Sequence, residues 1–163
     1  MSCVASVGSR GLCCQTDPHG KLRLSYPAYP WASRLNVNAL VMGMVLEELT
    51  GKILEASFEV ANELGHGFLE SVYVRALIVA LRQKGLAVES EVPLEVIFRG
   101  QSVGSFCADM VVERQVLVEL KAVRALAPEH QAQVINYLKA TGIEVGLLIN
   151  FGTPRIEFKR LHR

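Results

Sequence analysis

The chain has 163 residues, 50% of them apolar, and it carries 17 Lys and Arg residues against 16 Asp and Glu residues. This length and composition are typical of one globular domain with a sizeable core, and they exclude a chain that is disordered throughout. No apolar run approaches the ~18 residues that a transmembrane helix needs, so we expect no membrane partner. The four cysteines form neither a C-x-x-C pair nor a metal-binding spacing, which argues against a disulfide framework and makes the cytoplasm the expected location.

Charge is distributed unevenly along the chain. Residues 1–41 carry four basic groups and one acidic group, a net charge of +3, whereas the remaining 122 residues carry 13 basic and 15 acidic groups, a net charge of −2. A protein that holds duplex DNA by general electrostatics is usually basic, so any interaction with nucleic acid has to be reconciled with a slightly acidic domain. The stretch between Arg155 and Arg163 is rich in basic residues and could form a local patch for nucleic acid.

The first 41 residues show no sustained periodicity and are rich in Ser, Gly and Pro. We interpret residues 1–41 as a disordered or loosely attached extension. The regular pattern starts near Met42 or Met44, which makes both methionines candidate start sites and leaves open whether the extension is native. Residues 42–163 form the predicted domain.

Within residues 42–163 the pattern predicts elements in the order ααββββαββ. Apolar residues recur at three- and four-residue spacing in the first two helices, and glycines follow both. The helices are predicted at 46–64, about 69–84 and 128–141, and the strands at 87–91, 94–98 (after an interruption at Pro93), 103–112, 116–123, 145–151 and 155–161. The fifth strand is apolar throughout, as expected of a strand buried on both faces, and the last reads as an edge strand. This order predicts a single α/β (α+β) domain with a central mixed β-sheet flanked by helices.

Two neighbouring predicted strands carry charged residues in otherwise apolar sequence. Alternation places Glu119 and Lys121 on the same face of their strand. If residues 113–115 form a three-residue hairpin loop, counting back from it puts Asp109 opposite Glu119. Two carboxylates and an ammonium group then converge in a setting where an unpaired charge is costly.

A divalent cation such as Mg²⁺ satisfies carboxylates of this kind and offsets the negative charge that builds on a phosphate during hydrolysis. A neighbouring lysine orients or deprotonates the attacking water, or stabilises the developing charge. Asp109 followed by Glu119-x-Lys121 is therefore a plausible set of residues for phosphodiester hydrolysis. The alternative from the pattern alone is a buried structural ion pair, because Glu-x-Lys is common by chance.

Several motifs stand in the order found in the PD-(D/E)XK nuclease superfamily. They are Asp109, Glu119-Leu120-Lys121 and Gln133-Val-Ile-Asn-Tyr137, the last of which resembles the Gln-x-x-x-Tyr signature of the RecB-like branch. Gly67-Phe-Leu-Glu70-Ser-Val-Tyr73 is similar to the motif of the bacterial GxxExxY proteins, which are grouped with this superfamily. The resemblance covers about residues 44–163 and implies a restriction-endonuclease-like fold.

The resemblance assigns Asp109 and Glu119 as ligands of a Mg²⁺ or Mn²⁺ ion and Lys121 as the catalytic lysine. Glu70 is implied as a further metal ligand or as a residue that positions water. The alternative from the sequence alone is that the Glu70 carboxylate simply complements the dipole at the N-terminus of its helix. Ala108 stands where the proline of the superfamily name is expected, and the cysteine cluster of the iron–sulfur members is absent, so we predict no such cluster.

Gln133 and Tyr137 are one helical turn apart and share a helix face. The resemblance implies that they lie beside the metal site, where they contact a DNA phosphate or orient Lys121. The alternative is that Tyr137 belongs to the core with its hydroxyl group on Gln133.

Three functions remain open from the sequence. The leading hypothesis is a metal-dependent deoxyribonuclease in repair, defence or mobile-element biology. The second is a non-catalytic nucleic-acid or protein-binding module that retains the nuclease core, which the acidic balance favours. The third is an oligomeric structural protein with architectural ion pairs. The sequence also leaves open whether the chain forms a homo-oligomer with a DNA channel, and whether a protein partner supplies DNA affinity.

Overall fold

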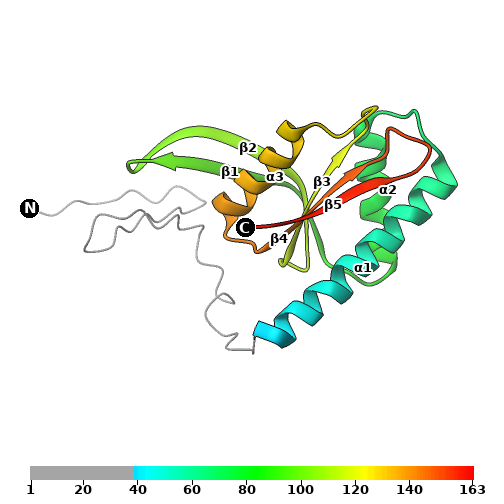
Figure 1. Ribbon diagram of the computed structural model, residues 1–163, viewed down its shortest axis with the longest axis horizontal. Coiled ribbons are helices and arrows are strands. Elements are labelled where there is room, and N and C mark those ends of the chain that lie inside the picture. The colour runs from blue at the N-terminus through cyan, green and yellow to red at the C-terminus, as the bar shows by residue number, and fades with distance from the viewer. Residues whose placement is uncertain (1–38) are drawn as a thin grey trace, which may run out of the picture.

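The computed structural model describes residues 39–163, which form three helices and five strands in the order ααβββαββ (Figure 1). The elements are α1 (Ala39–Leu64), α2 (Glu70–Gln83), β1 (Val88–Phe98), β2 (Gln101–Val112), β3 (Val116–Lys121), α3 (Pro128–Thr141), β4 (Val145–Asn150) and β5 (Glu157–His162). Most of the predicted N-terminal extension, residues 1–38, lies outside the described residues. The first helix begins at Ala39 rather than Leu46, because the apolar run before Leu46 lacks the polar spacing by which an amphipathic helix is recognised.

The five strands form one sheet in the order β1-β2-β3-β4-β5. The parallel neighbours β3 and β4 are joined through α3, and all other neighbouring pairs are antiparallel, so the predicted mixed sheet is confirmed. All six residues of β4 are buried, and β5 is an edge strand, both as predicted.

One sequence-based prediction for the sheet was wrong. We expected two strands separated by Pro93, but β1 runs unbroken through this residue, which pairs with Cys107 on β2. A proline is tolerated in a strand at the edge of a sheet, where β1 lies, because only one side of the strand needs its hydrogen-bonding groups.

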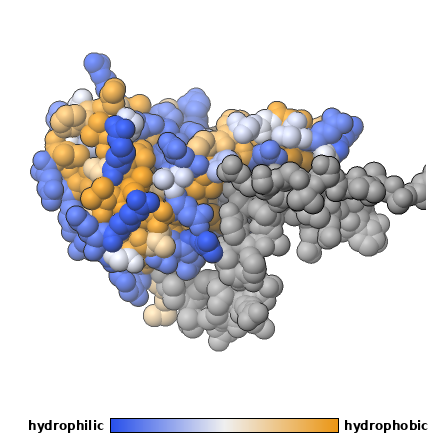
Figure 2. All heavy atoms as spheres, turned by 180° about the vertical axis from the view of Figure 1, so that it is seen from behind, coloured by the Kyte–Doolittle hydropathy of each residue, from blue (hydrophilic) through white to orange (hydrophobic). Residues whose placement is uncertain are grey.

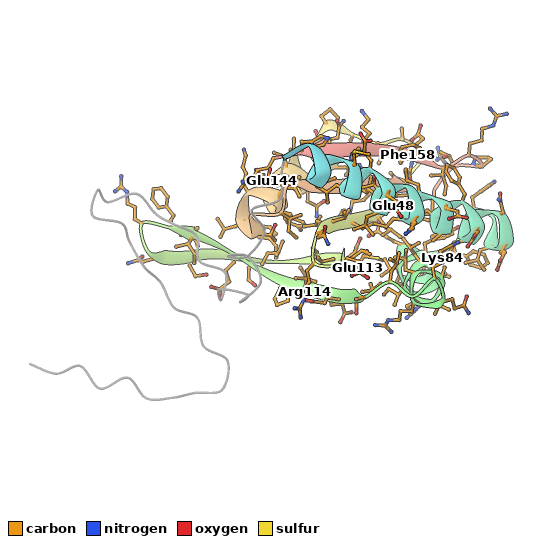
Figure 3. All side chains as sticks on the ribbon, turned by 90° about the horizontal axis from the view of Figure 1, so that it is seen from below. Glu48, Lys84, Glu113, Arg114, Glu144 and Phe158 are labelled. Atoms are coloured by element: carbon orange, nitrogen blue, oxygen red, sulfur yellow. The ribbon has the colours of Figure 1, made fainter. Side chains whose placement is uncertain are left out.

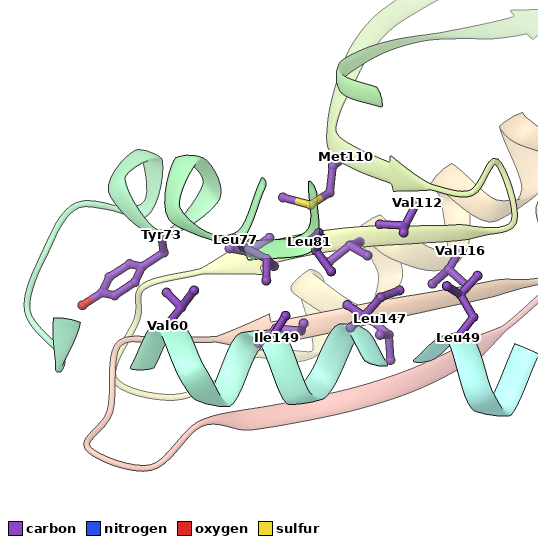
Figure 4. Packing of buried hydrophobic residues seen from close by; sticks show 14 of the residues in the cluster. Leu49, Val60, Tyr73, Leu77, Leu81, Met110, Val112, Val116, Leu147 and Ile149 are labelled. Atoms are coloured by element: carbon purple, nitrogen blue, oxygen red, sulfur yellow. The ribbon is translucent and has the colours of Figure 1, made fainter. Parts of the chain in front are cut away.

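Helices cover both faces of the sheet. On one face α1 and α2 pack against a large apolar cluster that includes Leu49, Leu77 and Leu147 (Figure 4). On the other face α3 packs against a smaller cluster through Val134 and Leu138. The molecule therefore has three layers, and the sequence-based fold class is confirmed.

The turn between β2 and β3 fixes the register of both strands. Glu113 and Arg114 both have positive φ, and Val112 pairs with Val116 across the three-residue loop, as predicted. The Glu113 carboxylate accepts a hydrogen bond from the Ala87 N–H at 2.7 Å, which ties the turn to the chain entering β1 (Figure 3). Because loop length determines hairpin register, this turn also determines which residues of β2 lie opposite β3.

The β1–β2 hairpin projects beyond the rest of the sheet as an arm, defined here as residues 92–108 (Figure 1). At the base of the arm the side chains of β2 change the face of the sheet to which they point. Ala108 packs in the cluster on the α3 side, whereas Met110 packs in the cluster on the α1–α2 side, although alternate residues of a regular strand share one face. Asp109 lies between them, and Glu91, between the pairing partners of Met110 and Ala108 on β1, has a φ of +53°. Asp109 is thus positioned at an irregularity of the sheet.

Candidate active site

Glu119 and Lys121 lie near the carboxyl end of β3. Glu119 is 3% exposed, and the ammonium group of Lys121 donates a hydrogen bond to its Oε1 at 2.8 Å. The two residues share one face of the strand because they are two positions apart. They form a close ion pair near the carboxyl end of this buried strand.

Asp109 joins this pair from β2. Pairing between β2 and β3 ends at Met110 and Val118, and Asp109 is the next residue of β2 beyond this pair. Its Oδ2 accepts a hydrogen bond from the Leu120 N–H at 2.7 Å. The carboxylate therefore fills the position at which a regular ladder would continue, and it is held against the backbone between Glu119 and Lys121.

Glu70 approaches the same lysine from the first turn of α2. Its Oε1 lies 3.9 Å from the Lys121 Nζ, and its side chain is 42% exposed. A carboxylate at a helix N-terminus also complements the helix dipole, so both interpretations made from the sequence fit its position. Glu70 is the most exposed acidic group around Lys121.

The loop before Glu70 is held by Tyr73. The Tyr73 hydroxyl donates to the Gly65 carbonyl oxygen at 2.9 Å and accepts from the Phe68 N–H at 3.2 Å. Its buried ring stacks on Phe151 at a centroid distance of 4.7 Å. In Gly67-x-x-Glu70-x-x-Tyr73, the tyrosine thus closes the turn between α1 and α2, while the glutamate faces the charged cluster.

Gln133 and Tyr137 lie on α3, the helix that covers this face of the sheet. The Gln133 Nε2 donates to the Tyr137 hydroxyl at 2.8 Å. Burial is the main cause that raises the pKa of Tyr137, and the charges of Glu119 and Asp109 act in the same direction. The hydroxyl therefore lies within electrostatic reach of the cluster, and the ring forms part of the core beneath α3.

The electrostatics of the cluster favour uptake of positive charge. Burial, reinforced by the charge of Asp109, raises the pKa of Glu119 to about 7. Burial also raises the pKa of Asp109, against the opposing hydrogen bond from Leu120 and the charge of Lys121. Burial alone would lower the pKa of Lys121, but its hydrogen bond to Glu119 and the surrounding carboxylates outweigh this and raise it. Lys121 is thus held as an ammonium ion beside two carboxylates that burial disfavours as anions.

Glu119 also carries the feature that best fits a cation. Its Oε2 is buried and finds no hydrogen-bond partner among the described residues, which is costly for a carboxylate oxygen. Asp109 and Glu119 would hold a Mg²⁺ or Mn²⁺ ion, which prefers carboxylate oxygens and supplies positive charge to a phosphate when bound. No group of three or more His, Cys, Asp or Glu side chains within residues 39–163 is arranged to hold a metal, so a site with Glu70 as a third ligand is not preassembled.

Asn150 is a residue at this site to which the sequence analysis gave no role. It is fully buried at the end of β4, opposite Lys121 in the parallel pairing. Its side chain accepts from the Val123 N–H at 3.0 Å and donates to the Val123 carbonyl at 2.9 Å. Gly152 packs so closely that a Cβ there would lie 2.2 Å from the Val123 oxygen. Asn150 and Gly152 therefore fasten the chain that follows Lys121.

The sequence matches a family model across residues 47–161, most of the chain, and that model describes the PD-(D/E)XK nuclease superfamily. The chain belongs to this superfamily. Asp109 on β2 and Glu119-x-Lys121 on β3, the residues on which the sequence resemblance to this superfamily depends, lie together in the fold. Membership makes a nuclease-like function the expected class.

One solved structure, "Crystal structure of SSO0001", matches with a TM-score of 0.48 and 21% sequence identity. The match covers 57% of this chain and 49% of that protein, so this chain corresponds to about half the length of the other. None of the curated proteins matches this member of the superfamily. In the part of the chain from residue 39 onward, no helix is long and apolar enough to span a membrane.

Proposed function

We propose that this chain hydrolyses phosphodiester bonds of DNA, with Asp109 and Glu119 as ligands of a Mg²⁺ or Mn²⁺ ion. The observation that carries the proposal is the buried Glu119 Oε2, which has no hydrogen-bond partner within the described part of the chain although its carboxyl group lies beside Asp109 and Lys121. A purely structural ion pair would be more stable with both carboxylate oxygens satisfied. An incompletely satisfied carboxylate in a nuclease fold is better explained by a ligand.

In this proposal the residues around the metal ion have distinct roles in binding and cleaving the DNA strand. Lys121 is an ammonium ion that stabilises the negative charge on the phosphate in the transition state, since its raised pKa disfavours a role as base. Glu70 orients Lys121 and accepts a hydrogen bond from the attacking water. Gln133 and Tyr137 contact the bound strand beside the metal site.

The motif Gly67-x-x-Glu70-x-x-Tyr73 further supports placement among the bacterial GxxExxY proteins, close to the RecB-like branch. The protein then acts in the cytoplasm, in repair, defence or mobile-element biology. Residues 42–163 constitute the nuclease domain in this proposal, with residues 1–41 as an extension.

One observation favours a second function. The domain carries a net charge of −2, and the ammonium of Lys121 already pairs with Glu119. A non-catalytic module that binds nucleic acid or protein would retain such a pair as architecture. In the nuclease proposal, DNA affinity comes instead from a second copy of the chain or from a protein partner.

The full chain, incubated with linear and circular DNA in single- and double-stranded form, tests the proposal. We expect cleavage in Mg²⁺ or Mn²⁺ and none in EDTA, because the charge of the bound cation is needed at the phosphate. Cleavage of circular DNA would identify an endonuclease, and cleavage of linear DNA alone an exonuclease. Binding without cleavage under all metal conditions would contradict the nuclease and support the non-catalytic module.

A further inference from the structure

A groove of about 770 Å³ lies between the projecting arm and α3. The arm contributes Val96, Val103 and Phe106 to its walls, and α3 contributes Gln133, Asn136 and Tyr137. Its volume is in the range of pockets that accept small organic groups. Tyr137 lines the groove and also lies within electrostatic reach of Glu119, Lys121 and Asp109, so the groove adjoins the candidate active site.

The walls of the groove are suited to a flat, uncharged group. Phe106 is 49% exposed, and the centroids of its ring and the Tyr137 ring lie 6.0 Å apart, with the two ring planes tilted by 52°. Apart from Glu95 and Gly104, the other arm residues on that wall are apolar, and the arm carries hydrophilic residues mainly at its end (Figure 2). Gln133 and Asn136 supply amide groups, which both donate and accept hydrogen bonds.

The charges around the groove disfavour a phosphate. Among the residues that the structure describes, the charged groups that line it are Glu95, Glu129 and Lys139. A nucleic-acid backbone would therefore meet a net negative charge there, whereas a base carries none. Aromatic side chains bind unpaired bases by stacking, and amides read the polar edges of bases.

We propose that this groove receives an unpaired nucleobase of the DNA strand whose phosphate is cleaved at Glu119 and Lys121. The base stacks on Phe106, with Asn136 at its polar edge. The inference rests on the proposed function and narrows its substrate to DNA with unpaired bases, such as single strands and frayed ends. Bases inside an intact duplex are stacked and paired, so they do not reach the groove without being extruded.

Binding measured by fluorescence anisotropy on the full chain in EDTA tests this inference without cleavage. The probes are a short thymidine strand, an abasic strand of the same length and a blunt duplex. We expect the thymidine strand to bind more tightly than the other two. Phe106→Leu should weaken its binding by about 5- to 150-fold, the range for loss of one stacked base, and leave the abasic strand unaffected.

The controls separate stacking from damage to the fold. Phe106→Trp retains an aromatic face and should keep the affinity of the wild type. Phe158→Leu removes a ring of similar exposure, 45%, on the opposite edge strand and should also have no effect. Thermal unfolding of each variant shows whether the fold is retained.

Three outcomes would overturn the inference. Equal affinity for the thymidine and abasic strands, with metal-dependent cleavage intact, would show that the groove binds no base. The proposed nuclease function would be unaffected by this result. A change of oligomeric state in Phe106→Leu, measured by sedimentation, would assign the groove to a second copy of the chain. Absence of both binding and cleavage for every probe would refute the proposed function and this inference with it.

Discussion

Replacing Lys121 with alanine is expected to slow DNA cleavage by about 10²- to 10⁴-fold, the range for loss of a positioned group that transfers protons or stabilises charge in the transition state. The reason is its position, because the lysine side chain is largely buried and its ammonium group lies 2.8 Å from Glu119 and 3.9 Å from Glu70. Water at the vacated position would screen the developing charge less well than a fixed ammonium group. The rate is measured in single-turnover cleavage at saturating Mg²⁺.

The lysine variant needs controls because it also leaves Glu119 without its partner. Lys121→Met retains most of the aliphatic side chain and should lose activity to the same extent. Lys52→Ala removes an exposed lysine on α1 that pairs with Glu48 at 2.7 Å, and it should leave the rate unchanged. Full activity in a folded Lys121→Ala protein would exclude the lysine from the chemistry and favour the non-catalytic module.

The second large effect is a dependence of stability on pH in the metal-free protein. The folded-state pKa of Glu119 is about 7, above its ordinary value of 4.5, so the folded state binds the proton more tightly than the unfolded state does. The contribution of Glu119 to stability is therefore fully present below about pH 4.5 and is lost as the pH rises through 7. The loss amounts to about 3 kcal/mol from the shift of the pKa.

Urea unfolding in EDTA, followed from pH 4.5 to pH 8, measures this effect. Glu119→Gln removes the titrating group, so its stability relative to the wild type should increase by about 3 kcal/mol over that range. Glu55→Gln changes an exposed carboxylate on α1 and should show no such increase. Parallel pH profiles for the wild type and Glu119→Gln would show that Glu119 is not held in an unfavourable ionised state.

The sequence is sufficient to predict the parts of the site that depend on local spacing. Strand alternation places Glu119 and Lys121 on one face, and the length of the turn after Val112 sets the register that brings Asp109 to them. The interactions responsible are short in sequence and determined by backbone geometry, which is why counting residues was enough.

The remaining parts depend on contacts between segments that are distant in sequence. The unbroken strand through Pro93 follows from its place at the sheet edge, which a pattern of residues does not reveal. Asn150 reaches the backbone of Val123 because β4 lies parallel to β3. In the sequence it is marked only as a polar residue at the end of an apolar strand. The groove at Phe106 forms because the arm lies beside α3, a contact between distant segments that the pattern of residues does not reveal.

The most direct test of the metal-dependent centre is the rate of DNA cleavage as a function of Mn²⁺ concentration for the wild type, Asp109→Asn and Glu119→Gln. Both substitutions are nearly isosteric and remove one negative charge. The account predicts no cleavage in EDTA, a rate that rises to saturation with Mn²⁺ in the wild type, and loss of cleavage in both folded variants. Cleavage that persists in EDTA, or that is unchanged in both variants, would contradict it.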